Sequence, residues 1–404
     1  MRGGAGCAIV AVPRARLKPA MTQTPPLFQP LALRDVTLKN RIAVSPMCQY
    51  SALDGHVTEW HRDHHTTLAR GGAGLVFVEA TAVERRGRIT HGDTGLWDDE
   101  QVVGLAEIAA IVAGYGACPG IQIGHAGRKA SAQRPWEGNV ALGEADAARG
   151  DAPWQTVAPS ALPFMEGWHV PGELAESEIV GLVESFARAA ARAARAGFRA
   201  LEIHGAHGYL IHSFLSPIAN RRGDRWGGDL KGRMAFALAV TEAVRAAWPG
   251  GLPLFFRVSS VDGVEGGWTI EDTVVLAREL KARGVDVVDC SSGGAAGMVT
   301  AARITRPQGF QTPYAARVRR EAAMATMTVG LIIEPDYADE IVAAGGADLV
   351  ALGRELLRNP FWPLQAAEAL GGDPDHALWP DPYGWWLDKR AKAGVEGRVP
   401  IGGG

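Results

Sequence analysis

The chain has 404 residues, of which 47% are hydrophobic, and its formal net charge is −3. This composition suits one large folded core rather than a disordered chain, and it argues against a nucleic-acid surface. The sequence has no apolar run of about 18 residues, so we expect no membrane-spanning helix. The four cysteines stand apart at positions 7, 48, 118 and 290, a spacing typical of neither a disulfide framework nor a metal cluster. We therefore expect a cytoplasmic protein.

The N-terminal residues 1–24 are basic with one short apolar stretch, and they lack the longer apolar region of a secretory signal. We expect a disordered extension, with translation starting at Met1 or Met21. Residues 25–375 are predicted to form one barrel domain, followed by a C-terminal tail at 376–404 that we expect at a subunit interface.

Eight short apolar runs follow one another from Arg41 onward. Their near-continuous hydrophobicity is typical of strands buried on both faces. The runs are Arg41–Met47, Gly74–Ala80, Gly120–Gly124, Ala200–His204, Pro253–Ser259, Val285–Ser291, Ala325–Ile332 and Asp348–Gly353.

Amphipathic stretches between these runs predict helices, which makes each crossover long enough for a parallel sheet. The predicted helices are Thr58–Arg70, Asp99–Ala113, Ser177–Ala196, a helix opening at Thr269, Pro335–Ala344 and Pro360–Leu370. Eight such units predict a (β/α)8 TIM barrel, with a doubly wound open sheet as the alternative. The irregular stretch 126–176 predicts an insertion over the active-site face, after the third strand.

The fourth run, Ala200–Ile203, leads into His204, His207 and Tyr209. In a barrel, residues at the carboxyl ends of strands face one mouth. Two imidazoles can donate to one substrate oxygen, and a phenol nearby can deliver a proton. The alternatives are a pair of loop histidines with a packed tyrosine, or a metal-dependent hydrolase site. The hydrolase lacks obvious carboxylates, because we expect Glu202 to point away from the mouth.

Other strand ends suggest a large anionic ligand. Gly353-Arg354 after the last strand is placed where barrels bind phosphate. Arg257 is a fixed charge that should meet an anion, and Gln122 suits the edge of a heterocycle. Cys48 either packs in the core or touches a cofactor. His61, His64 and His65 are expected in surface or packing roles, because no third metal ligand is evident.

Together, these segments resemble the old yellow enzyme family of FMN-dependent ene-reductases, over roughly residues 25–390. The resemblance is greatest to the bacterial class whose first strand ends in a cysteine. The segments that carry it are Ser45–Tyr50, His125–Lys129, His204 with His207 and Tyr209, Phe214–Pro217 and Asn220–Gly228. It implies noncovalent FMN, NADPH or NADH as reductant, and an α,β-unsaturated carbonyl substrate.

The resemblance also implies roles for single residues. Tyr209 would donate a proton, His204 and His207 would bind the substrate oxygen, and Tyr50 would touch the substrate, with Lys129 nearby. The implied flavin contacts are Ser45, Pro46, Met47 and Cys48, the last as a redox tuner, together with Ala80, Gln122 and Arg257 at the ring and Gly330, Gly353 and Arg354 at the phosphate.

The sequence departs from the family at Trp226, where a tyrosine is usual, and in its Trp-rich tail around 382–387. The Cys48 and Tyr50 pair favours ene reduction over the amine dehydrogenases and demethylases of the same fold. We expect a small enone as substrate, no nucleic-acid or membrane partner, and a homodimer or homotetramer.

Overall fold

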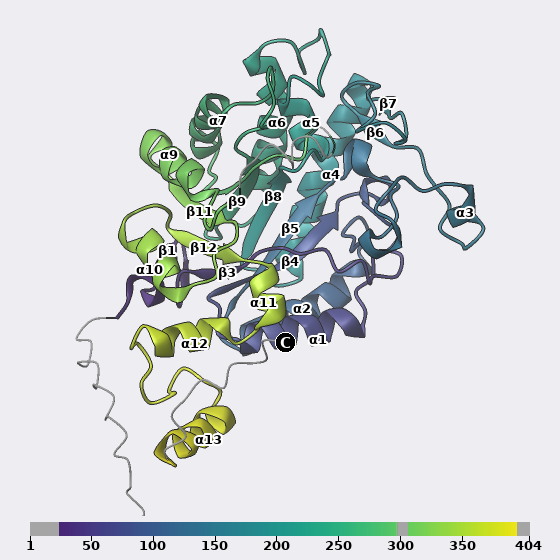
Figure 1. Ribbon diagram of the computed structural model, residues 1–404. Coiled ribbons are helices and arrows are strands. Elements are labelled where there is room, and N and C mark those ends of the chain that lie inside the picture. Colours follow the sequence, from purple (N-terminus) through teal and green to yellow (C-terminus); the bar gives the residue numbers. More distant parts are fainter. Residues whose placement is uncertain (1–23, 296, 298–305, 394–404) are drawn as a thin grey trace, which may run out of the picture.

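The computed structural model describes residues 24–295, 297 and 306–393. These residues form a closed barrel of eight parallel strands wrapped by helices (Figure 1), so the predicted TIM barrel is confirmed. Around the barrel the strands are β3 (Ile42–Val44), β4 (Leu75–Ala82), β5 (Cys118–Gly124), β8 (Ala200–Gly205), β9 (Leu254–Ser259), β10 (Val287–Ser291), β11 (Ala325–Val329) and β12 (Leu349–Leu352).

Helices follow the strands and cover the outside of the barrel. They are α1 (Glu59–Arg70), α2 (Gln101–Gly114), α4 (Glu176–Arg195), α5 (Leu210–Leu215), α6 (Leu230–Ala247), α7 (Ile270–Ala282), α9 (Thr312–Ala322), α10 (Pro335–Ala343), α11 (Arg354–Arg358) and α12 (Trp362–Ala369). The sequence pattern predicts those at 59–70, 101–114, 176–195, 270–282, 335–343 and 362–369, and it does not predict the others. The predicted cap of α7 is present, because Thr269 Oγ1 accepts the backbone N–H of Asp272 at 3.2 Å. No helix in the described part is long and apolar enough to cross a membrane.

Two predicted strands end earlier than expected, each for a backbone reason. β3 was predicted to reach Met47, but Pro46 has no N–H to donate to a ladder, and the strand ends at Val44. β11 was predicted to reach Ile332, but Gly330 turns the chain with a φ of 128°.

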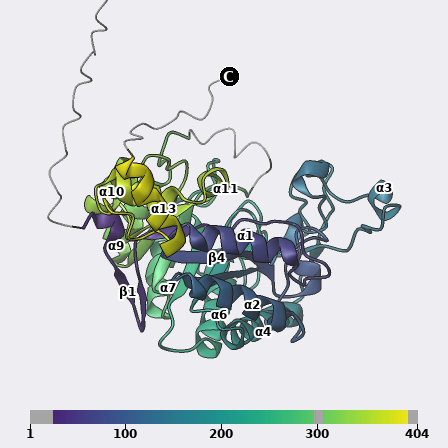
Figure 2. The ribbon, with the colours of Figure 1, turned by 90° about the horizontal axis from the view of Figure 1, so that it is seen from below.

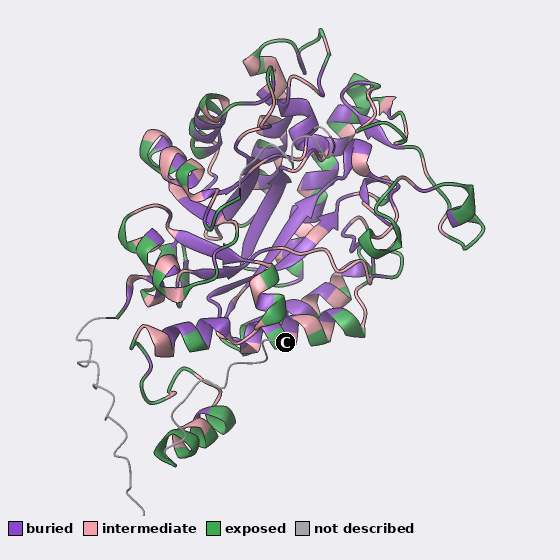
Figure 3. Ribbon diagram, in the orientation of Figure 1, coloured by how far each residue is buried: buried purple, intermediate pink, exposed green. Residues whose placement is uncertain are grey.

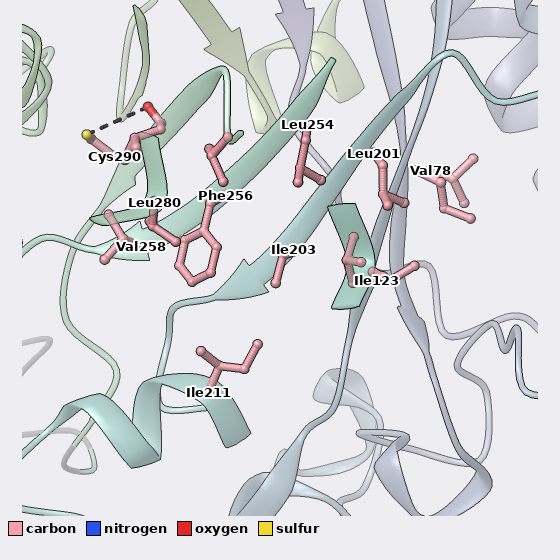
Figure 4. Packing of buried hydrophobic residues seen from close by; sticks show 14 of the residues in the cluster. Val78, Ile123, Leu201, Ile203, Ile211, Leu254, Phe256, Val258, Leu280 and Cys290 are labelled. Atoms are coloured by element: carbon pink, nitrogen blue, oxygen red, sulfur yellow. Dashed lines mark hydrogen bonds between the residues drawn. The ribbon is translucent and has the colours of Figure 1, made fainter. Parts of the chain in front are cut away.

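The barrel strands are buried along most of their length (Figure 3), and their apolar side chains belong to two clusters, one outside and one inside the barrel. Outward-facing side chains such as Ile203, Phe256 and Val258 pack beneath the surrounding helices (Figure 4). Inward-facing Phe77 and Phe255 meet edge-on at the opposite end from the mouth, with ring centres 5.4 Å apart. The hairpin of β1 (Leu31–Leu33) and β2 (Val36–Leu38) packs on this inner cluster, so only the carboxyl end of the barrel stays open for chemistry.

Two further segments extend beyond the barrel. The insertion after β5 carries the short parallel pair β6 (Val157–Ala158) and β7 (Gly172–Glu173), and its helix α3 (Glu144–Ala147) projects from the body in Figure 1. The tail contains a helix that the sequence pattern did not predict, α13 (Asp381–Lys392), which lies beside α1 in Figure 2. Residues 1–23 of the expected extension and residues 394–404 of the tail lie outside the described residues.

Candidate active site

The end of β8 brings His204, His207 and Tyr209 together. The His204 ring lies edge-on to the other two, with ring centres 5.2 Å from His207 and 5.0 Å from Tyr209. His207 and Gly208 both have a positive φ, 63° and 76°. A Cβ on Gly208 would lie 2.0 Å from the carbonyl oxygen of Gly294, so only glycine fits this turn.

A buried pair of residues holds this turn from below. Gly208 N–H donates to His212 Nδ1 at 2.8 Å, and His212 Nε2 lies 2.9 Å from Asp262 Oδ1. Because Nδ1 accepts a hydrogen bond, the imidazole proton sits on Nε2 and faces the carboxylate. Asp262 Oδ2 also accepts from Ser216 Oγ at 2.6 Å and from Trp268 N at 2.8 Å. Burial acts to raise the pKa of Asp262, but His212 and these hydrogen bonds outweigh burial and lower it.

The two site histidines are held as neutral donors. Burial, and then the nearby Arg257 cation, lower the pKa of His204 and of His207 well below the usual range. His207 Nε2 lies 2.6 Å from Ser291 Oγ, and its backbone N–H donates to Ser259 Oγ at 2.9 Å. A neutral imidazole keeps one N–H that can be turned toward a substrate oxygen.

Tyr209 and Lys129 form the opposite side of the same site. Burial raises the pKa of Tyr209, so its phenol stays protonated at neutral pH. Lys129 Nζ lies 5.0 Å from the centre of the Tyr209 ring and donates to the carbonyl oxygen of His207 at 2.9 Å. Burial, and then Arg128, lower the pKa of Lys129 to about 8.

The segment after β3 supplies Cys48 and Tyr50. Burial, and then the carboxylates of Asp93 and Glu79, raise the pKa of the Cys48 thiol. Hydrogen bonds with the Ala80 backbone and Tyr50 offset the shift only in part, so the thiol stays protonated. Tyr50 has a left-handed φ of 51° and meets Trp136 edge-on with ring centres 5.9 Å apart. Glu79 on β4 fixes this segment, because its side chain accepts the backbone N–H of Gln49 and lies 3.3 Å from His61 Nε2.

The floor of the site carries charges that sequence reasoning misplaced or missed. Glu202 was expected to point away, which is wrong: it is fully buried inside the barrel, and Gln122 Nε2 donates to its Oε1 at 2.7 Å. Residues 202 and 204 are two apart on a strand and so share a face. Arg257 does meet an anion, but this is Asp289 on β10, with Nε 3.0 Å from Oδ2. Burial, and then Asp289, raise the pKa of Glu202.

A hollow of about 270 Å³ lies between the ends of β11 and β12, separate from the His204 and Tyr209 group. Its lining includes two glycines, two guanidiniums and one carboxylate, from Gly330, Gly353, Arg354, Arg358 and Glu355, so positive charge is in excess there. A Cβ on Gly330 would lie 2.8 Å from the Phe310 ring, which leaves glycine as the residue that fits. This hollow therefore suits a phosphate.

The structure places the other predicted residues around the same mouth. Ser45 is buried and its Oγ accepts from Arg257 Nη1 at 3.3 Å, while Pro46 and Met47 are half-buried. Ala80 lines a small hollow with His204, Tyr209 and Asp93. In α1, His61 and His65 are buried, which agrees with a packing role. Among the described residues, no group of three His, Cys, Asp or Glu side chains is placed to hold a metal ion.

Comparison with known proteins decides the family. Residues 26–372 match the model of the NADH:flavin oxidoreductase / NADH oxidase family. The chain belongs to this family. It is 46% identical to an NADPH dehydrogenase of Geobacillus sp. (strain WCH70), over 85% of this chain and 94% of that protein. It is thus an FMN-dependent NAD(P)H oxidoreductase of the old yellow enzyme type.

Solved structures agree on the fold. An old yellow enzyme homologue from Zymomonas mobilis is 26% identical and superposes with a TM-score of 0.70, over 85% of this chain and 93% of that one. A 2-naphthoyl-CoA reductase in complex with 2-naphthoyl-CoA is 24% identical with a TM-score of 0.75, over 85% of this chain. The chain spans about half the length of that reductase, 52%, and the likeness shows the fold alone.

The residues present fit FMN. The pyrimidine edge of a flavin offers carbonyl acceptors and an N–H donor, and Gln122, Arg257 and Ser45 supply matching groups on the floor. Glu202 Oε2 and Asp289 Oδ1 are buried and have no hydrogen-bond partner among the described residues. This is expected where a bound polar ring would supply polar contacts that the protein lacks. The hollow lined by Gly330, Gly353 and Arg354 suits one phosphate, as in a mononucleotide.

Replacing Gly330 with Val should weaken FMN binding. The added side chain would meet the Phe310 ring and force a β-branched residue into a positive φ. Heating the purified protein and measuring the released flavin by mass spectrometry should show FMN at close to one per chain for the parent and a clear loss for the variant. The matched control is Gly223→Val, at a glycine whose Cβ would meet no atom within 4 Å. Release of FAD from the parent would contradict the single-phosphate account.

The sequence analysis did not predict roles for Glu79, Asp93, Ser291 and Asp289, and it placed Glu202 on the wrong face. Glu202, Ser291 and Asp289 lie on strands, and counting alternate residues along β8 and β10 would have placed them on the inner face. Glu79 lies where the register of β4 shifts between Val78 and Ala80, so simple alternation does not place it. Asp93 gave no such signal, because it lies in the loop after β4. Its carboxylate is held by the backbone N–H groups of Ile89 and Thr90, and burial raises its pKa to about 7.

Proposed function

We propose that the protein is an ene-reductase, which transfers hydride from NAD(P)H by way of FMN to the β-carbon of an α,β-unsaturated carbonyl compound. The observation that carries the proposal is the group of His204, His207 and Tyr209, whose rings converge on the mouth of the barrel. Burial keeps both imidazoles neutral and the phenol protonated, which are the states that this chemistry needs.

The chain's own residues would act in two steps. His204 and His207 would donate N–H groups to the carbonyl oxygen, which draws electrons from the C=C bond and orients the substrate. FMN, when bound, supplies the hydride. Tyr209 would then deliver its O–H proton to the α-carbon. Tyr50 would contact the substrate, and the protonated Cys48 thiol would lie against the flavin as a redox tuner.

The remaining contacts follow the same proposal. The flavin ring would lie against Ser45, Pro46, Met47, Ala80, Gln122 and Arg257, and its phosphate against Gly330, Gly353 and Arg354. Arg257 would stabilise the negative charge that a reduced flavin carries near its pyrimidine edge. The proposed compartment is the cytoplasm, where the free thiols of Cys48, Cys118 and Cys290 would stay reduced.

The test is steady-state kinetics with NADPH and a cyclic enone. Since one site would serve both reactants in turn, double-reciprocal plots should give parallel lines, the pattern of a ping-pong reaction. Mass spectrometry should show a saturated ketone as product. Intersecting lines would indicate a ternary complex and contradict the use of one site, and oxidation of an amine instead would favour the dehydrogenase alternative.

We also propose an oligomer built from dimers, formed through the tail. In α13, Trp385 and Trp386 are 55% and 67% exposed, and Leu378 just before the helix is 53% exposed. Such neighbouring apolar side chains are typical of an interaction surface. Light scattering at micromolar concentration should give a dimer or tetramer for the parent chain. Truncation after Asp375 should reduce the number of chains in the assembly. A parent chain that is a monomer would contradict the proposal.

A further inference from the structure

A basic groove lies at the mouth of the barrel, outside the residues already assigned. It encloses about 400 Å³ and is formed by the loops after β3 and β4 and by the insertion. Its charged lining is Arg85, Arg88 and Arg134 against Asp54 and Asp151, together with His91. Three guanidiniums and two carboxylates line the groove, which leaves one positive charge in excess among the Arg and Asp side chains, and Arg134 also pairs with Glu137 beside it at 3.4 Å.

Arg88 is the least balanced of these charges. Its side chain is 7% exposed and lies between two aromatic rings, with the guanidinium carbon 5.6 Å from the ring centre of Trp97 and 5.2 Å from that of Trp154. Its nearest carboxylate is Asp54, at 3.7 Å from Nη1. That carboxylate already pairs with Arg85 at 2.6 Å. The half-exposed Asp54 therefore serves two guanidiniums, and the more distant Asp93 is the other carboxylate that acts on Arg88. A buried cation gains most from a closer anion.

The groove adjoins the reaction site through the backbone. Arg134 Nε donates to the carbonyl oxygen of Tyr50 at 3.2 Å, and the lining residue Ala52 follows two residues later. On the other wall, His91 faces the groove while Asp93 faces the hollow that holds His204 and Tyr209. A long ligand can therefore place one end over the site and the other in the groove.

We propose that this groove binds the 2′-phosphate of NADPH, and that Arg85 and Arg88 give the enzyme its preference for NADPH over NADH. A phosphate monoester is close to dianionic at neutral pH, and guanidinium groups bind its oxygens as a two-pronged fork. NADH carries an uncharged hydroxyl at the same place and gains nothing there. The proposal rests on the proposed function, in which NAD(P)H reduces the flavin at the site.

The first experiment compares both nucleotides in the holoenzyme. Arg85 is suited to substitution because its side chain is 61% exposed, so R85Q should fold. In anaerobic stopped-flow reduction, the ratio of NADPH to NADH efficiency should fall about 10-fold or more in R85Q, and further in R88Q. The matched control is R188Q, an exposed arginine on α4 paired with Glu184, which should keep the parent ratio.

A binding measurement needs no turnover. Calorimetry with adenosine 2′,5′-bisphosphate should show binding to the parent holoenzyme that R85Q weakens, whereas adenosine 5′-phosphate should bind both proteins equally. An unchanged nucleotide ratio in both groove variants would overturn the proposal, as would equal losses with NADPH and NADH. A parent protein without preference for NADPH would overturn it too.

Two other outcomes stay distinguishable. A phosphate group on a thioester substrate could bind the same guanidiniums as the 2′-phosphate of NADPH. The KM values of a phosphorylated thioester enone and of a simple enone are therefore compared in the parent and in R85Q. If only the thioester loses affinity in R85Q while the nucleotide ratio holds, the groove serves the electrophile and our assignment is wrong. If enones are not reduced but the NADPH preference still falls in R85Q, the proposed function fails and the groove assignment stands.

Discussion

Replacing Tyr209 with Phe is expected to slow reoxidation of the NADPH-reduced enzyme by an enone about 100-fold or more, while reduction by NADPH stays close to the parent rate. The α-carbon loses its acid, but the substitution keeps the ring that meets His204. The two half-reactions can be followed separately by flavin absorbance in anaerobic stopped flow. FMN content should be unchanged.

Tyr50→Phe serves as the matched control, because it removes a second half-buried phenol at the same mouth. It is expected to slow enone reduction less than Tyr209→Phe does. If Tyr209→Phe leaves the oxidative half-reaction unchanged, another group or water delivers the proton. A large effect of Tyr50→Phe in its place would move the proton-donor role to the segment after β3.

Replacing Asp262 with Asn is expected to lower the free energy of unfolding by about 3 kcal/mol, because the buried His212 loses its charged partner. The effect should reach the site, since His212 holds the N–H of Gly208 between His207 and Tyr209. A displacement of about 1 Å in such a turn can cost about 100-fold in rate. We expect slower enone reduction and weaker binding of phenols, whose long-wavelength band over the flavin reports the affinity.

The matched control for this change is Asp99→Asn, an exposed carboxylate paired with Arg192 and Arg195. Exposed ion pairs contribute little to stability, so the unfolding free energy of Asp99→Asn should differ from that of the parent by about 1 kcal/mol or less. Chemical denaturation measures both variants. If Asp262→Asn is destabilised but binds phenols and reduces enones like the parent, the pair is structural and does not position the turn.

Much of the fold could be predicted from the sequence because parallel strands buried on both faces are short and almost continuously apolar. All eight runs became barrel strands, and Thr269 begins α7 as its capping pattern indicates. The errors lie at strand ends, where a single residue such as Pro46 or Gly330 stops the ladder. The helix α13 was missed because its sequence is rich in Pro and Trp, which gave no clear period.

The site was harder to predict because it joins residues far apart in the chain. Gln122 meets Glu202, 80 positions later, and Arg257 meets Asp289 on the next strand. Propensity and local motifs do not report such pairs, although counting alternate residues back from His204 would have turned Glu202 inward. The groove with Arg88 needs loops from three parts of the barrel, and the sequence pattern gave no sign of it.

The most direct test of the central claim is a two-step anaerobic experiment on the purified holoenzyme. One equivalent of NADPH is added until the yellow flavin band is bleached, and a cyclic enone is then mixed in without oxygen. We predict that the band returns and that one equivalent of the saturated ketone forms. A band that stays bleached until oxygen is admitted, with the enone recovered unchanged, would contradict ene reduction at this site.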